Sequence, residues 1–225
     1  MKKLSLCALS VVAGTLTAPT FVSAQTAGTW LARAGATRIS PDVRSGNLSA
    51  PSFAGTQADI GNATSLSGGV TYMLSDHVSI DLPLALPFKH DIVGAGAIAN
   101  VGKIGETKAL PATLLAQYRF LSPTSAFRPY AGAGLTYAKF FSERSTAALS
   151  GLTGGTPANP TTLSVESKFA PTFQVGATLA ISDRWAINAS YSFTKLKTRT
   201  TLSAGQTLDA RLDPSALSVD LVYRF

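Results

Sequence analysis

The sequence predicts an all-β chain that folds as an eight-stranded antiparallel transmembrane β-barrel with short periplasmic turns and long extracellular loops. Three observations support this fold class. The chain is apolar on average, with a mean hydropathy of +0.21 and 14% charged residues. After residue 24 it has no run of about 18 apolar residues, the length that indicates a membrane-spanning helix. Its apolar side chains alternate instead with small or polar ones in segments of about ten residues, as in a wall with one lipid face and one lumen face.

The first four segments cover residues 28–40, 62–74, 77–88 and 110–120. Each is long enough to cross a bilayer as a tilted strand. Their apolar faces, predicted to point outward, comprise Trp30, Ala32, Ala34, Ala36, Leu66, Val70, Tyr72, Leu74, Val78, Ile80, Leu82, Leu84, Leu86, Leu110, Ala112, Leu114, Ala116, Tyr118 and Phe120. Their inward faces comprise Arg33, Gly35, Thr37, Ser65, Ser67, Thr71, Ser79, Asp81, Pro83, Ala85, Thr113, Gln117 and Arg119.

The last four segments cover residues 127–141, 167–181, 184–198 and 211–225. The same alternation predicts that they complete the barrel wall. Their outward faces comprise Ala131, Ala133, Leu135, Tyr137, Phe173, Val175, Ala177, Leu179, Ile181, Trp185, Ile187, Ala189, Tyr191, Phe193, Leu217, Val219, Leu221, Tyr223 and Phe225. Their inward faces comprise Gly132, Gly134, Thr136, Thr172, Gln174, Gly176, Thr178, Asn188, Ser190, Ser192, Ser218, Asp220 and Arg224.

The connections between the segments alternate in length, as they do in outer-membrane barrels. Short connections fall at 75–76, 121–126 and 182–183, and long ones at about 41–61, 89–109, 142–166 and 199–210. An even number of strands places both termini on the side of the short turns, the periplasm. Aromatic residues near strand ends are expected to form two interfacial girdles. They are Trp30, Tyr72, Phe88, Phe120, Phe127, Phe141, Trp185, Tyr223 and Phe225.

The alternative is a soluble β-barrel or sandwich whose apolar faces point inward, because alternation alone does not give the direction of the face. Two observations favour lipid. The opposite faces are rich in Gly, Ser and Thr and carry several charges, which suits packing inside a narrow barrel better than contact with water. The chain also ends on an aromatic residue after an alternating run.

Residues 1–24 have the layout of a secretory signal peptide. Lys2 and Lys3 precede an apolar run over 4–16, and Val22-Ser23-Ala24 forms a small-x-small cleavage site. The apolar run is shorter than a spanning helix needs, which disfavours the alternative of an uncleaved anchor. Cleavage after Ala24 would leave one domain, residues 25–225, in the cell outer membrane. The only cysteine, Cys7, would be removed, so no disulfide or cysteine-ligated metal is expected.

The charge and the histidines argue against several functions. The formal net charge of +7 falls by two when Lys2 and Lys3 are removed, and the basic residues are spread along the chain, so nucleic-acid binding is not expected. His77 and His90, the only histidines, fall at opposite ends of the predicted barrel. Neither has a serine nucleophile placed beside it, so the chain is not expected to be an enzyme or to hold a metal or other cofactor. A monomer is expected.

Five stretches make the chain resemble the OmpW family of small outer-membrane proteins. In order they are 86–92 (LPFKHDI), 110–118 (LPATLLAQY), 127–137 (FRPYAGAGLTY), 211–214 (RLDP) and 223–225 (YRF). The resemblance covers nearly all of residues 25–225. It implies an eight-stranded barrel with a narrow, largely apolar interior that passes small hydrophobic molecules across the outer membrane, with a lateral opening toward lipid. It also implies a constriction of bulky apolar residues at positions that Pro83 and Ser192 occupy in this sequence.

The inward faces provide candidates for controlling the lumen. Leu115 and Pro83 lie midway along the wall. Near the periplasmic side the alternation gathers Arg33, Asp81, Gln117, Arg119, Asp220 and Arg224 on the inward face. Charges in so narrow a lumen should pair with one another. They predict a structural ion-pair plug or, alternatively, a polar gate.

The end of the chain resembles the recognition signal of the barrel assembly machinery. Tyr223 and Phe225 stand on the same face of the last segment, and Phe225 is the terminal residue. The simpler interpretation is a plain strand that closes the barrel, and both can hold at once.

Two functions follow from these patterns. The first is a narrow channel for passive passage of small hydrophobic molecules, with outer-membrane lipid as its surroundings. The second is a surface interaction or structural envelope protein that binds lipopolysaccharide, phage or host through its long loops.

Overall fold

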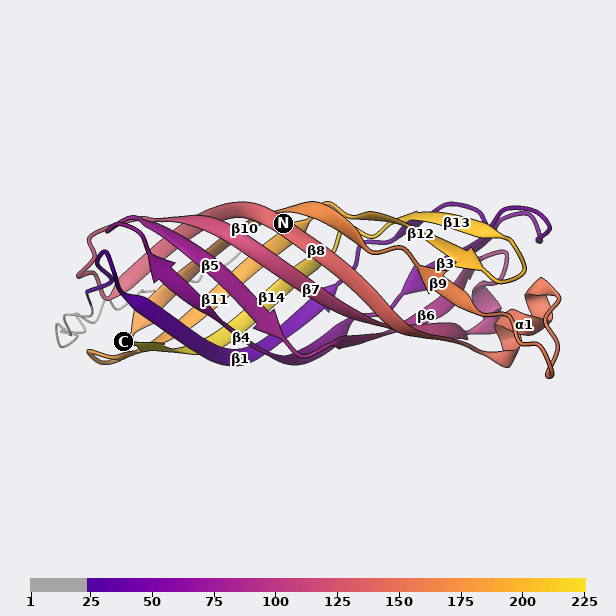
Figure 1. Cartoon of the computed structure of the whole chain (residues 1–225), viewed down its shortest axis with the longest axis horizontal. Helices are drawn as coiled ribbons and strands as arrows, with labels where there is room; N and C mark the ends of the chain where they lie inside the picture. Colours follow the sequence, from indigo (N-terminus) through magenta and orange to yellow (C-terminus); the bar gives the residue numbers. More distant parts are fainter. Residues whose placement is uncertain (1–23) are drawn as a thin grey trace, which may run out of the picture.

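The computed structural model describes residues 24–225, which fold into one closed barrel. The predicted signal peptide, apart from Ala24, lies outside the described residues. Eight strands of the described part form the wall, as predicted. In order around the barrel they are β1 (Trp30–Ser40), β4 (Ala63–Met73), β5 (Val78–Ala85), β7 (Lys103–Arg119), β8 (Phe127–Ser145), β10 (Lys168–Ala180), β11 (Trp185–Thr194) and β14 (Ser215–Arg224). Figure 1 shows a long, narrow cylinder of tilted strands.

The first and last strands close the barrel. β1 pairs with β14 from Leu31↔Arg224 to Ser40↔Ser215, and on its other side with β4. All of these pairings are antiparallel. Closure gives the first and last strands partners on both sides, which a sheet needs in hydrocarbon because no water is there to satisfy a free edge.

The apolar faces of the wall strands point outward. Leu66, Leu135 and Val175 on three different strands are 67%, 59% and 55% exposed. The alternate positions, such as Thr71 and Asn188, are buried inside the barrel. A continuous apolar outer surface of this extent would be costly in water and is stable against lipid chains. The predicted direction of the alternation is therefore confirmed, and the soluble alternative is wrong.

The turn end of the barrel carries the predicted short connections and an aromatic girdle. Trp30 contacts Tyr72 with 4.7 Å between ring centroids, and Trp185 contacts Tyr223 at 4.8 Å. Both chain ends of the described part lie at this end, where Phe225 N–H donates to the Trp30 carbonyl. Amphipathic rings in this position match the boundary between lipid and headgroups.

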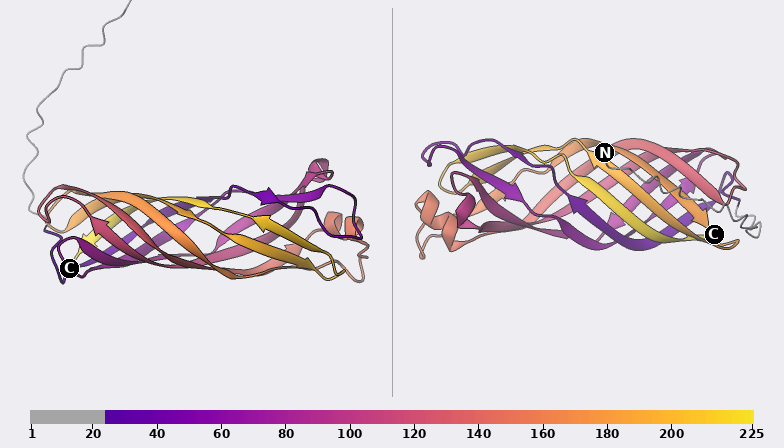
Figure 2. Two further views of the ribbon diagram at one scale, coloured as in Figure 1. Left: turned by 90° about the horizontal axis from the view of Figure 1, so that it is seen from above. Right: turned by 180° about the vertical axis from the view of Figure 1, so that it is seen from behind.

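The long connections lie at the opposite, loop end, and much of their length is strand. They contain β2 (Arg44–Ser45), β3 (Thr56–Ile60), β6 (Phe88–Gly96), β9 (Leu163–Val165), β12 (Lys197–Leu202), β13 (Thr207–Arg211), the 3-10 helix η1 (Ala99–Val101) and α1 (Ala147–Thr153). Figures 1 and 2 show these elements extending the cylinder at one end. Thr146 caps α1 by accepting from Leu149 N–H, and Gly154 ends it in the left-handed conformation. No helix among the described residues is long and apolar enough to span a membrane.

The loop end reverses the polarity of the wall. Its apolar side chains point inward, where Ile92, Ile104 and Leu202 belong to one buried cluster. Its charged side chains, among them Lys89 and Lys103, point outward and form ion pairs. This reversal follows from the solvent, because this part of the barrel extends beyond the lipid and meets water on its outside.

The reversal on one side of the barrel occurs at Pro87, and it corrects one prediction. Leu86 and Pro87 are both exposed, so the alternation slips by one residue and Phe88 turns inward with 1% exposure. Phe88 therefore lies in the lumen. Its predicted place in an aromatic girdle is wrong. His90 follows it in β6, inside the barrel wall, where the sequence had predicted a loop. Proline lacks an N–H donor and so favours such irregular positions in a strand.

Candidate functional site

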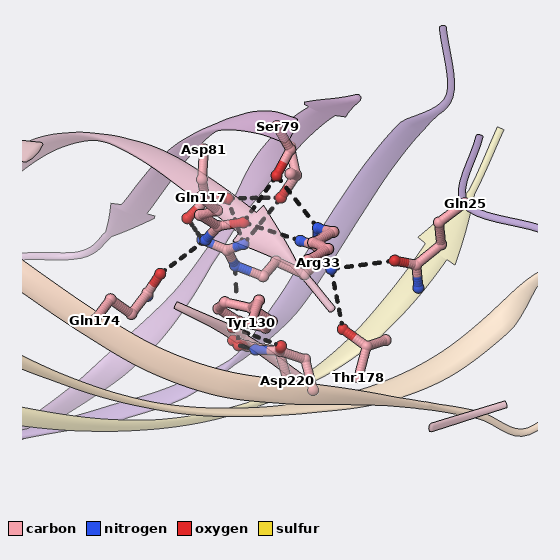
Figure 3. A network of polar contacts seen from close by, with 12 residues as sticks. Gln25, Arg33, Ser79, Asp81, Gln117, Tyr130, Gln174, Thr178 and Asp220 are labelled. Atoms are coloured by element: carbon pink, nitrogen blue, oxygen red, sulfur yellow. Dashed lines mark hydrogen bonds and ion pairs between the residues drawn. The ribbon is translucent and has the colours of Figure 1, made fainter. Parts of the chain in front are cut away.

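A layer of buried polar side chains closes the lumen near the turn end. We call it the polar floor, and all eight wall strands contribute to it. Its members are Gln25, Arg33, Thr71, Ser79, Asp81, Gln117, Arg119, Arg128, Tyr130, Gln174, Thr178, Asn188 and Asp220. Figure 3 labels nine of these side chains, which converge from opposite walls.

Arg33 and Asp81 form the central ion pair of the floor. The two guanidinium nitrogens Nη1 and Nη2 donate to the two carboxylate oxygens over 2.6 and 2.8 Å. Thr71, on the strand between them, donates to Asp81 over 2.6 Å and accepts from Arg33. Asp220 lies 3.9 Å from Arg33 Nε on the other side. These buried charges are paired and hydrogen-bonded, the condition under which a low-dielectric interior tolerates them.

Arg119 has no carboxylate within salt-bridge distance among the described residues and is held by neutral groups. Its guanidinium donates to Ser79, Gln25, Gln117 and Thr178 over 3.0–3.4 Å. It also lies over the Tyr130 ring, 4.8 Å from the ring centroid. A cation above an aromatic face is favourable, the more so where water is excluded.

Gln25 and Arg128 close the polar floor on the side that faces the turn end. Arg128 is fully buried and donates to the Gln25 carbonyl over 2.7 Å and to the carbonyl of Asp76. Gln25 in turn accepts from Arg119 through its side chain. Because the segment around Gln25 precedes the first wall strand, the N-terminal end of the described chain crosses the turn-end mouth of the barrel.

On the loop-end side of the polar floor, threonine and serine hydroxyl groups line the wall and form hydrogen bonds with one another. One chain runs Thr113–Thr136–Thr172–Thr194 with oxygen–oxygen distances of 2.6–2.9 Å. A second joins Thr37 to a serine on each side. Since these hydroxyls satisfy one another within the wall, they make little demand on the lumen for hydrogen bonds.

A cavity of about 140 Å³ opens above the polar floor; we call it the barrel cavity. Apolar side chains, including Phe88, Leu115 and Leu196, line it together with these hydrogen-bonded threonine and serine hydroxyls. A second cavity of about 70 Å³, the loop-end cavity, follows toward the loop end and is lined by the inward apolar cluster there. Ile60, Thr107, Phe140 and Leu212 line both cavities, so the two meet at these side chains.

The wall beside the barrel cavity is interrupted between β5 and β7. Their register runs from Val78↔Tyr118 to Asp81↔Leu115, and pairing with β7 resumes only at Phe88↔Ala109 in β6. Within the described chain, residues 82–87 and 110–114 thus face each other without ladder pairs; we call this region the wall gap. Three prolines lie in it, Pro83, Pro87 and Pro111, and none can donate to a ladder. Leu84 lines the cavity and is also 54% exposed on the outer wall.

The candidates predicted from the sequence lie where the alternation placed them, except Arg224. Pro83, Leu115 and Ser192 line the barrel cavity, with Leu115 only 1% exposed. The floor brings together Asp81, Gln117, Arg119 and Arg33. Arg224 lies at the rim instead, where it donates to the Ala24 carbonyl over 2.6 Å. Tyr223 and Phe225 stack edge-on at 5.0 Å on the outer surface. The roles assigned to these residues stay predictions.

Four residues of the site were not predicted from the sequence. Tyr130, Arg128 and Gln25 hold the floor, and Phe88 lines the cavity. The alternation that gave the other inward faces also passes through Arg128 and Tyr130, so it could have found these two. Gln25 precedes the first strand and Phe88 follows a slip in register, so no periodic signal marks them.

The loop-end rim carries acids beside its bases. Arg199 donates to both carboxylate oxygens of Asp209 over 2.7 and 2.9 Å, and Lys168 lies 3.0 Å from Glu166. Within the described residues no group of three or more His, Cys, Asp or Glu side chains is arranged to hold a metal ion.

Comparison with known proteins identifies the group to which this barrel belongs. The model of the OmpW family matches residues 26–225. The chain belongs to the OmpW family. Outer membrane protein W of Vibrio cholerae is 32% identical over 99% of this chain and all of its own length. Outer membrane protein AlkL of Ectopseudomonas oleovorans is 27% identical over 88% of this chain and 83% of its own.

A solved structure agrees with the fold. The crystal structure of the outer-membrane protein OprG from Pseudomonas aeruginosa superposes with a TM-score of 0.81 and 26% identity, over 91% of this chain and 99% of OprG. The protein is therefore an outer-membrane β-barrel of the OmpW family, surrounded by lipid. These relatives are barrel proteins of the outer membrane rather than members of enzyme families. The alternative role in binding lipopolysaccharide, phage or host through the loops stays a prediction.

Proposed function

We propose that this OmpW-family protein is a passive path for small hydrophobic molecules that ends in the membrane rather than in the periplasm. In this path a molecule moves from the loop-end cavity into the barrel cavity and leaves sideways through the wall gap. The observation that carries the proposal is the position of the apolar barrel cavity, directly above a hydrogen-bonded polar floor and beside an interrupted stretch of wall.

The polar floor supports a lateral rather than an axial exit. An apolar molecule that continued through the floor would have to break the Arg33–Asp81 pair and the contacts of Arg119, and it could replace none of their hydrogen bonds. The wall gap requires no such loss, because residues 82–87 and 110–114 have no ladder pairs with each other to separate. The lateral route is therefore the one of lower cost.

The energetics of the solute favour the same route. A small apolar molecule gains about 25 cal/mol for each Å² of its surface that leaves water. The loop-end and barrel cavities offer apolar walls for this, and lipid offers a continuous apolar phase beyond the gap. No energy source is needed, because each step moves the solute between apolar surroundings.

A disulfide across the wall gap tests the proposal. Continuing the register of Asp81↔Leu115 places Leu84 opposite Ala112. In the double variant Leu84→Cys with Ala112→Cys, a disulfide would therefore cross-link β5 to β7 across the wall gap. Cys7, the only native cysteine, lies in the predicted signal peptide and would not interfere. Uptake of the neutral hydrophobic dye N-phenyl-1-naphthylamine by cells that express the variant should fall under oxidising conditions and recover on reduction.

Two controls make the result decisive. Each single cysteine variant should take up dye at the wild-type rate under both conditions. The variant Ala85→Trp places a large ring in the same gap without any cross-link and should also slow uptake, since Ala85 lines the barrel cavity. Unchanged uptake in both the oxidised double variant and Ala85→Trp would contradict a lateral exit.

A further inference from the structure

We propose that the path contains a recognition site for a neutral hydroxyl group, formed by His90 and Thr107 where the two cavities meet. The inference rests on the proposed function and names a class of solute for it: small alcohols and phenols with an apolar body. It arises from two polar side chains buried in otherwise apolar surroundings.

His90 and Thr107 are neighbours across two strands. They are directly paired in the register between β6 and β7, which places their Cβ atoms about 5 Å apart. His90 is 4% exposed and Thr107 2%. Both line the barrel cavity, and Thr107 also lines the loop-end cavity. A molecule that moves from one cavity to the other therefore passes this pair.

The hydrogen bond of His90 fixes which ring nitrogen is available. Nδ1 lies 2.8 Å from the Gly61 carbonyl oxygen. A carbonyl only accepts, so Nδ1 carries the proton of this bond. In the neutral ring Nε2 is then an acceptor, and within the described residues it makes no hydrogen bond. The imidazole is thus held in one orientation by Gly61 and has an unused acceptor.

Thr107 contributes an unused hydroxyl. Its Oγ1 is buried and has no hydrogen-bond partner among the described residues. Buried polar groups are rarely left unpaired, because the lost hydrogen bonds to water are not replaced. Rotation about χ1 exchanges Oγ1 with the methyl group, which is of similar size, and so can turn the hydroxyl toward the cavity.

The chemistry of the pair matches a neutral hydroxyl. Such a group can donate its proton to His90 Nε2 and accept one from Thr107 Oγ1. An alkane can do neither. A carboxylate has no proton for Nε2, and a charged ammonium group would lose its hydration among Phe88, Phe140 and Leu212 without an anion to compensate. The pair therefore favours neutral alcohols and phenols over hydrocarbons and ions.

NMR of the purified protein in detergent micelles can separate recognition of the hydroxyl group from occupancy of the cavity. The chain has two histidines, so the imidazole ¹⁵N signals of His90 and His77 can be assigned directly. His77 lies at the turn end, bonded to the Arg119 carbonyl, and serves as the internal reference. The methyl signals of Leu115, which lines the barrel cavity, report whether any molecule has bound. The probes are 1-octanol and octane.

We expect octane to move the Leu115 methyl signals alone, and octanol to move both these and the His90 Nε2 signal, with His77 unchanged. Thr107→Val removes the hydroxyl at nearly constant volume and should weaken octanol binding roughly fivefold, the effect of one hydrogen bond between neutral groups, while octane binding is unchanged. Thr161→Val is the control, because Thr161 is a buried threonine that lines neither cavity and whose hydroxyl is bonded to Thr153.

The outcomes distinguish this inference from the proposed function. If both probes move Leu115 and the His90 Nε2 signal responds to neither or equally to both, the hydroxyl site is wrong while the apolar path stands. Equal binding of octanol by wild type and Thr107→Val would also overturn the site. If neither probe moves Leu115, the proposed path itself fails.

Discussion

Arg33 and Asp81 form a two-pronged ion pair between strands that are not neighbours, with Nη1–Oδ1 at 2.6 Å and Nη2–Oδ2 at 2.8 Å. β4 lies between their strands and contributes Thr71, which bonds to both side chains. The pair therefore ties three strands together inside the barrel. It is central to the polar floor and to the question of whether that floor is a plug or a gate.

Asp81→Asn should destabilise the barrel by roughly 3 kcal/mol, because it leaves the Arg33 charge buried without its close partner. Urea unfolding in lipid vesicles would measure the change. Asp220→Asn is the matched control and should cost less, since Asp220 lies 3.9 Å from Arg33. Conductance of single proteins in planar bilayers should stay low in both variants. Unchanged stability together with raised conductance in Asp81→Asn would mean that the floor is a gate rather than a plug.

Gly176 should not tolerate a methyl group. A Cβ there would lie 2.6 Å from the Tyr130 ring and 2.7 Å from the Ala189 carbonyl, closer than such atoms approach. Gly176→Ala would push the ring away and strain its 2.8 Å hydrogen bond to Asn188, at a cost of roughly 1–3 kcal/mol. Gly151→Ala is the control, with nothing within 4 Å of the added atom. Equal urea midpoints for the two variants would show that the Tyr130 ring can move aside without lowering the free energy of unfolding.

Phe225→Ala should reduce the amount of protein that reaches the outer membrane, if the chain end is read by the assembly machinery. Phe169→Ala is a close control, because Phe169 is 73% exposed against 75% for Phe225, and each ring contacts one tyrosine. Loss of exposed apolar surface should affect both variants alike during refolding of purified protein in detergent. In cells only Phe225→Ala should accumulate in the periplasm. Similar levels of both in the outer membrane would argue against an assembly signal.

The strand pattern in the lipid-facing part could be predicted from the sequence because the physical contrast there is strong. Lipid outside and a packed lumen inside require strict alternation, and Leu82, Leu114 and Leu217 all lie outward as predicted. The floor residues Arg33, Asp81, Gln117 and Arg119 followed from the same alternation. The partner of each charge did not, because Arg33 and Asp81 are 48 positions apart and meet only through the tilt and pairing of the strands.

The loop end could not be predicted in the same way. Beyond the bilayer the outside of the barrel meets water instead of lipid, so the apolar face points inward. In addition, the alternation shifts by one residue at Pro87, and the pairing is irregular between Glu106 and Lys108. A fixed period read across these points predicts the wrong face for Phe88. The wall gap contains Pro83, Pro87 and Pro111. It could not be predicted, because it is defined by which residues of distant strands pair with each other.

The loop-end rim gives a prediction for acid conditions. Glu106 accepts hydrogen bonds from Lys89 and Lys103, each over 2.9 Å. These two bonds lower the pKa of its carboxyl from 4.5 to about 2, and the bond from Lys89 contributes most. Because the pKa is depressed in the folded protein, the stabilising effect is present above the unfolded value near 4.5 and is lost as the pH falls through about 2. A ¹³C NMR titration of the Glu106 carboxyl in micelles should show this midpoint.

Glu106→Gln should remove that titration and the loss of stabilisation at low pH that accompanies it. The neighbouring pair of Lys103 and Asp91, 2.7 Å apart, would remain and keep β6 joined to β7. Since Glu106 lies on the outer surface, away from the cavities, dye uptake at neutral pH should not change. A carboxyl midpoint close to 4.5 in the wild type would show that the lysines do not hold Glu106 in solution. In that case β6 and β7 would be joined there by the Lys103–Asp91 pair and the backbone ladder, without Glu106.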